Sequence, residues 1–178
     1  MNGYNIAEAG HLVQLITPQS IVATTNSQCF NMGKAEHVSI ILQLGTITTA
    51  PVVTVAAFQT AAAALANTGG IAIPFRYYTC ESGGTTIDIS SPPVVATSSG
   101  FTPSKINNSY AIIEIDSAEI NFLPGTGTPS ENDSNGSDYP FLTLVLTSGN
   151  TYAAAVAVLS GVRWQYQSGG AYSLQATI

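Results

Sequence analysis

Charged side chains are scarce in this sequence. Only 8% of its residues are Asp, Glu, Lys or Arg, against about 25% in ordinary soluble domains. The four cations, Lys34, Arg76, Lys105 and Arg163, stand singly along the chain and face ten acids, for a net charge of −6. Because isolated cations cannot neutralise a run of phosphates, the sequence argues against a nucleic-acid partner.

The polarity of the chain comes instead from Thr, Ser, Asn, Gln and Gly. Neutral polar side chains cost little to desolvate, so a surface of this kind suits permanent contacts between subunits. We therefore expect a homo-oligomer or a component of a larger assembly. A secreted or cell-surface β-domain with the same composition is the alternative.

Long apolar runs and cysteines are also scarce. No stretch of 18 apolar residues occurs, so neither a transmembrane helix nor a membrane partner is expected. Residues 1–10 lack the basic start and apolar stretch of a signal peptide. Cys29 and Cys80 are too few for a disulfide framework. Two isolated thiols are more often small buried side chains, and a single Cys29–Cys80 bridge is the alternative.

Motifs of the common catalytic classes are missing. His11 and His37 are the only imidazoles, and neither belongs to an HExxH or HxH pattern. The GxSxG, P-loop and Rossmann glycine patterns do not occur. A lone histidine at a strand start is usually a surface or capping side chain. The sequence thus predicts that the chain is not an enzyme and has no catalytic residue, metal site or cofactor.

Glu114 and Asp116 are the strongest exception, because they lie two residues apart on one face of a predicted strand. With Glu119 nearby they could form a weak calcium site or a glycosidase-like pair. The simpler interpretation is an outward face that carries solvated acids, and we favour it.

A second acidic group lies in the low-complexity stretch 124–138. Its acids, Glu131, Asp133 and Asp138, superficially resemble a calcium loop but lack the EF-hand spacing and its terminal Glu. An exposed, mobile loop is the favoured interpretation.

Aromatic residues suggest one further site. Tyr77, Tyr78, Trp164 and Tyr166 could form a sugar-binding platform. At these positions they fit better as packing residues of the domain or of an interface.

The chain is organised around residues 139–164, where two apolar runs flank a polar turn that contains Gly149 and Asn150. This pattern predicts a β-hairpin. Neither face of either strand is polar, so both strands should be covered on both sides. Such strands belong in the middle of a sandwich or in a sheet buried against a neighbouring subunit.

Alternating apolar residues predict further strands, and 110–116 alternates most regularly, with Ala111, Ile113 and Ile115 pointing inward. The other predicted strands are 11–16, 37–45 and 51–58 joined as a hairpin through 46–50, 71–79 with Pro74 at an edge or bulge, and 85–90. Residues 59–70 contain one short helix or a bulged loop, and 91–109 form a long connection.

This count of strands predicts an all-β fold, an antiparallel β-sandwich that is jelly-roll-like, with at most one short helix. The sandwich domain spans 11–164. Residues 1–10 form an N-terminal arm, and 165–178 form a C-terminal tail or edge strand.

Four stretches carry a resemblance to a known family. They are the strands of 37–58, the Ile-Pro-Phe-Arg-Tyr-Tyr segment at 73–78, Tyr-Ala-Ile-Ile-Glu-Ile-Asp at 110–116, and the apolar strands that end in Gly-Val-Arg-Trp at 161–164. Together they resemble small structural proteins of tailed bacteriophages, and are similar to head decoration (cement) proteins built as β-sandwiches.

The resemblance implies a virion protein on the outer capsid surface, made in the cytoplasm of the host bacterium. It implies a homo-oligomer, with a trimer favoured, that binds the major capsid protein and clamps adjacent capsomers. Another virion part, such as a tail, neck or head-fibre base protein, is the alternative. A carbohydrate-binding β-sandwich module is a weaker one.

Overall fold

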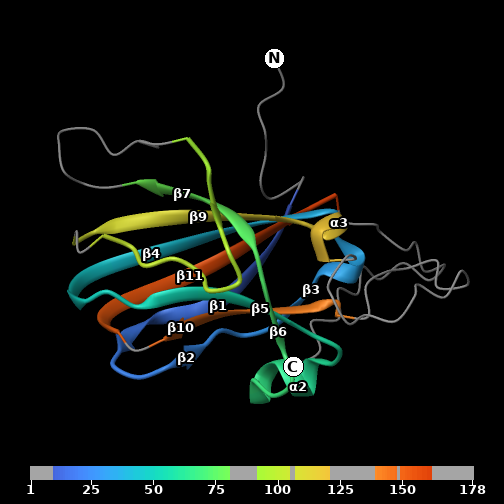
Figure 1. The fold of residues 1–178 in the computed structure, drawn as a ribbon, viewed down its shortest axis with the longest axis horizontal. Helices are drawn as coiled ribbons and strands as arrows, with labels where there is room; N and C mark the ends of the chain where they lie inside the picture. The colour runs from blue at the N-terminus through green and yellow to red at the C-terminus, as the bar shows by residue number, and fades with distance from the viewer. Residues whose placement is uncertain (1–9, 81–91, 105–106, 121–138, 148, 162–178) are drawn as a thin grey trace, which may run out of the picture.

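The computed structural model describes residues 10–80, 92–104, 107–120, 139–147 and 149–161. They form two antiparallel sheets packed face to face (Figure 1), which confirms the predicted all-β sandwich. Sheet A has the strand order β1 (Gly10–Ile21), β11 (Asn150–Ser160), β4 (His37–Thr49), β9 (Ser109–Asp116), β7 (Phe75–Cys80) and β8 (Val94–Ala96). Sheet B has the order β2 (Thr25–Asn26), β10 (Phe141–Thr147), β5 (Val52–Phe58) and β6 (Ile71–Ile73), with β3 (Phe30–Asn31) also beside β10.

The core lies between the two sheets and is built from alternate residues of their strands. In β4 the inward residues Val38, Ile40 and Leu42 are fully buried, whereas Ile41 between them is exposed. The strand β9 shows the same alternation along its whole length. Its predicted inward face is therefore confirmed, since side chains of period two must divide between a core face and an outer face.

Both predicted hairpins are wrong in their pairing. Strand β10 lies in sheet B and pairs with β2, β3 and β5, while β11 lies in sheet A between β1 and β4. Strands β4 and β5 are divided between the sheets in the same way. The β4–β5 and β10–β11 connections lie against each other, because a Cβ on Gly149 would lie 3.0 Å from Cβ of Pro51. A short polar turn can join two neighbouring strands of one sheet or two strands in opposite sheets, and both turns here connect the two sheets of the sandwich.

Proline positions mark two more differences from the sequence prediction. Strand β1 continues past Pro18 to Ile21, with register shifts between Gln14 and Gln19. Edge strands and bulges tolerate the missing proline N–H, and β1 has both features. Pro74 divides the predicted 71–79 strand into β6 at the edge of sheet B and β7 in sheet A.

The predicted short helix is confirmed as α2 (Ala61–Ala66), which packs on the outer side of sheet B against β5 and β10. Thr60 caps its start by accepting a hydrogen bond from the Ala63 N–H, 3.1 Å away. Asn67 ends it in the left-handed conformation, at φ 50°. The remaining helices are η1 (Met32–Lys34) and α3 (Ser117–Ile120).

The long 91–109 connection contains the edge strand β8. It also closes one side of the sandwich, since Phe101 exchanges backbone hydrogen bonds with Val53 of sheet B at 2.8 and 3.0 Å. The predicted strand 85–90, the acidic loop 124–138, residues 1–9 of the arm and the tail 165–178 lie outside the described residues.

Cys29 is a free thiol. Burial raises its pKa above the ordinary 9.0, so the thiol stays protonated at neutral pH and is a weak nucleophile. Within the described residues, no helix is long and apolar enough to cross a membrane.

Candidate functional site

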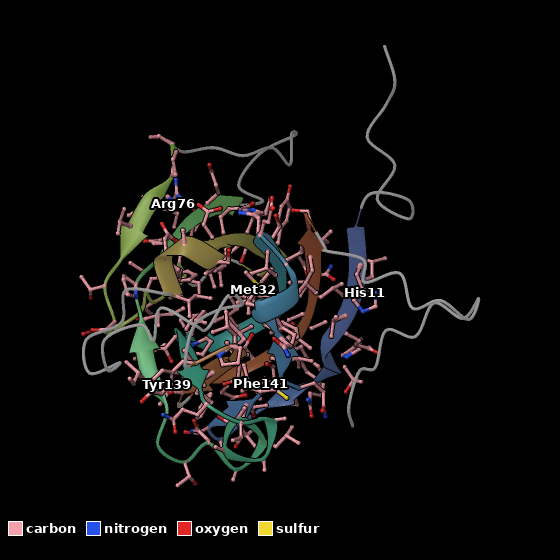
Figure 2. All side chains as sticks on the ribbon, turned by 90° about the vertical axis from the view of Figure 1, so that its right-hand side faces the viewer. His11, Met32, Arg76, Tyr139 and Phe141 are labelled. Atoms are coloured by element: carbon pink, nitrogen blue, oxygen red, sulfur yellow. The ribbon has the colours of Figure 1, made fainter. Side chains whose placement is uncertain are left out.

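Charged side chains of the described residues gather at one end of the sandwich, onto which Figure 2 looks. Antiparallel pairing explains the gathering, because β4 begins where β9 ends: His37 pairs with Asp116, and Glu114 pairs with Arg76 of β7. The Ser117 N–H also donates to the Glu36 carbonyl, at 2.8 Å. The set comprises Glu36, His37, Arg76, Glu114, Asp116 and Glu119.

His37 is the centre of this cluster. Its Nδ1 lies 2.7 Å from Oδ1 of Asp116, and its Nε2 contacts a carboxylate oxygen of Glu114. The Ser39 hydroxyl donates to the same Glu114 oxygen at 2.7 Å. The imidazole is thus held from both sides by carboxylates that lie two residues apart on β9.

Arg76 completes the network from β7. Its Nη2 donates to Oδ2 of Asp116 at 2.6 Å and to Oε1 of Glu119 at 3.2 Å. The Asp116 N–H donates to the other Glu119 oxygen at 3.4 Å, which ties the start of α3 to the end of β9. We name these six residues (His37, Ser39, Arg76, Glu114, Asp116 and Glu119) the ion-pair cluster.

The pKa of His37 reflects two opposing effects. Burial lowers this pKa, while hydrogen bonds and charge from Asp116 and Glu114 raise it more, so the pKa lies above the ordinary 6.5. When His37 is protonated, it and Arg76 together face three carboxylates. The acids therefore point outward as predicted, but they are ion-paired and not simply solvated.

The geometry tests the catalytic interpretations of these acids. Ser39 Oγ lies 3.4 Å from His37 Nε2, and with Asp116 on Nδ1 this has the connectivity of a Ser-His-Asp triad. However, Glu114 accepts the Ser39 proton and contacts Nε2, so the hydroxyl is not directed at the base. Both Glu114 and Asp116 are engaged by His37, which also disfavours the glycosidase pair. Within the described part of the chain, no cluster of acids, His and Cys could hold a metal ion.

The other predicted site residues are dispersed. His11 lies on β1, separated from β4 by β11, and does not join the cluster. Tyr77 stacks on Phe101 with ring centroids 4.0 Å apart and planes at 11°, so it packs the side of the sandwich. Tyr78 alternates to the opposite face of β7, so the two tyrosines do not form one platform. Trp164, Tyr166, Glu131, Asp133 and Asp138 lie outside the described residues.

The role of His37 and Arg76 was missed at the sequence level, although a signal exists. Glu114 and Asp116 lie two residues apart on one strand, and the basic residues His37 and Arg76 stand opposite them on the two strands that pair with it, as expected of cross-strand neighbours of opposite charge. His37 and Glu114 are 77 residues apart in the sequence, so their pairing could not be predicted from local sequence patterns.

A second surface of interest is the outer face of sheet A beyond this cluster, which carries no charged side chain among the described residues. Tyr152 is 61%, Leu12 53% and Ile41 40% exposed. The cross-strand register places them in one continuous surface, made by Leu12, Gln14, Ile41, Gln43, Tyr78, Ile112, Tyr152, Ala154 and Val156.

No protein-family model and no curated protein sequence matches this chain. Among solved structures, the chain is similar to the SPBc2 prophage-derived protein YomS, with a TM-score of 0.42 and 10% sequence identity. The similarity covers 84% of this chain and 93% of that chain.

Proposed function

We propose that this chain is a virion structural protein with no catalytic activity, and specifically a decoration protein of a phage head. It binds the major capsid protein on the outer surface, as a homo-oligomer for which three copies are favoured. The observation that carries the proposal is the confinement of charge to one end of the sandwich. His37, Arg76 and three carboxylates pair at one end of the outer face of sheet A, and the rest of that face carries no charged side chain among the described residues.

This division suits a protein that acts by adhesion. A charged group in a contact must be desolvated, which costs several kcal/mol per ion unless it is well paired. The uncharged part of the outer face of sheet A avoids this cost in a contact between copies, and the ion-pair cluster lies at its border. Many copies on one lattice turn a modest affinity for each capsomer into strong overall attachment.

The β-sandwich also supplies the rigidity that a clamp needs. The side chains between its two sheets are buried, and Phe101 of the 91–109 connection pairs with both the N–H and the carbonyl of Val53 in sheet B. A rigid body loses little conformational entropy when it binds, so more of the contact energy remains available to hold capsomers together.

The test compares heads of the phage that encodes this chain, assembled with and without it. Heads without the chain should assemble but release their DNA at a lower temperature. Added purified chain should restore the heat resistance. Heads of equal heat resistance would contradict the proposal, and cryo-EM density for the chain on the tail or portal would favour a different virion role.

A further inference from the structure

The strand β11 is apolar on both faces, like β10, yet its outward side is open at Tyr152 and half-open at Ala154 and Val156, and only Val158 is buried there. In β10 the outward residues Thr143 and Val145 are 0% and 7% exposed, and α2 packs on that side of sheet B. In β11 the outward Tyr152 is 61% exposed, and no described element packs over the outer face of sheet A. The sequence of β11 is therefore that of a covered strand, while its cover is not among the described elements.

From this mismatch we infer that the outer face of sheet A, around Ile41, Gln43, Ile112 and Tyr152, is the surface on which another copy of this chain docks. The inference rests on the proposed function, since a decoration protein is expected to act as an oligomer. It goes further by naming the contact surface.

Charge favours another copy as the occupant. The chain carries a net charge of −6, so two copies repel each other wherever their acids approach. Beyond the ion-pair cluster, the outer face of sheet A carries no charged side chain among the described residues, and the acids at its border are already paired with His37 and Arg76. Two copies can therefore meet here without burying an unpaired charge. A cationic partner would instead find its counter-charges at the cluster.

The size of the face is sufficient for a stable contact. Five strands, β1, β11, β4, β9 and β7, cross it, at about 4.8 Å each, and about seven residues of β4 run along it at about 3.3 Å each. This gives roughly 550 Å² per copy and about 1,100 Å² for two copies, where a specific interface needs about 1,000 Å².

The test places a charge in the face without changing its shape. Gln43→Glu adds a carboxylate to the exposed centre of the face, and Gln59→Glu adds one to an exposed residue directly after β5 of sheet B. Size-exclusion chromatography with light scattering should give a mass of two or more copies for the wild type. The Gln43→Glu variant should self-associate at least about ten-fold more weakly than the wild type, while Gln59→Glu behaves as wild type.

A wild-type monomer, or an oligomer that Gln43→Glu leaves unchanged, would overturn the inference. Circular dichroism melting of each variant verifies that the fold is retained. Head protection is scored separately on the same samples. A monomer that still protects heads refutes only this inference, whereas an oligomer that does not protect them refutes only the proposed function.

Discussion

The outer faces of the two sheets both carry apolar strand residues, but only that of sheet B is covered by the described part of the chain. On sheet B, α2 packs over β5, and Phe58 and Ala64 are fully buried. On sheet A, Ile41 and Tyr152 remain exposed. An apolar strand pattern therefore indicates that a sheet face is covered. Only the assembled structure shows whether the covering element belongs to the same chain.

The largest effect on stability is expected at sheet B, where α2 of the same chain covers the outer face. Phe58→Ala should lower the free energy of unfolding by about 3–5 kcal/mol, because it opens a cavity between α2 and sheet B. Urea denaturation measures this loss. A loss below about 1 kcal/mol would mean that α2 does not hold Phe58 against the sheet, and the contrast between the two faces would fail.

A matched pair on β4 compares the inside with the outside of sheet A directly. Ile40 is fully buried, and Ile41 is 40% exposed. Ile40→Ala should cost about 2–5 kcal/mol, whereas Ile41→Ala in dilute, monomeric protein should cost about 0.5 kcal/mol. Urea denaturation of both variants gives the comparison. Equal losses would show that the outer face is already covered within one chain.

A smaller effect is expected at the ion-pair cluster. Asp116→Asn removes the carboxylate shared by His37 and Arg76 and should cost about 1 kcal/mol, a value limited by the partial exposure of the side chains. The pKa of His37, followed by NMR, should fall. Glu36→Gln, at the same end but with no ion pair among the described residues, is the control. An unchanged His37 pKa in Asp116→Asn would refute the contact.

The smallest effect is the pH dependence of stability that His37 contributes. Its pKa is raised in the folded state, so the folded chain holds the proton more tightly than the unfolded chain. This contribution is fully present below the unfolded pKa of 6.5 and is lost as the pH rises through the folded pKa. Urea midpoints of wild type and His37→Gln, compared from about pH 5 to about pH 9, should converge toward high pH. A constant difference would refute the raised pKa.

Much of the local fold could be predicted from the sequence. The regular alternation of 110–116 fixed the inward face of β9, and Ala-rich composition located α2. Strand pairing could not be predicted, as the two wrong hairpins show. The turn at Gly149 is compatible with a hairpin within one sheet and with a connection between the two sheets. Which of these arrangements forms depends on contacts with strands far away in the sequence.

The candidate site was predictable only in part. The common face of Glu114 and Asp116 follows from the period of one strand. Their engagement by His37 and Arg76 does not, since it requires the register of β4, β9 and β7.

The sequence by itself determined the β class, the inward faces and the scarcity of charge, because these depend on composition and on the two-residue period of an extended backbone. The tertiary structure alone decided which strands share a sheet, where the charges meet and which apolar face stays open. Several strand pairings bury similar apolar area, so only the closure of the whole sandwich selects among them.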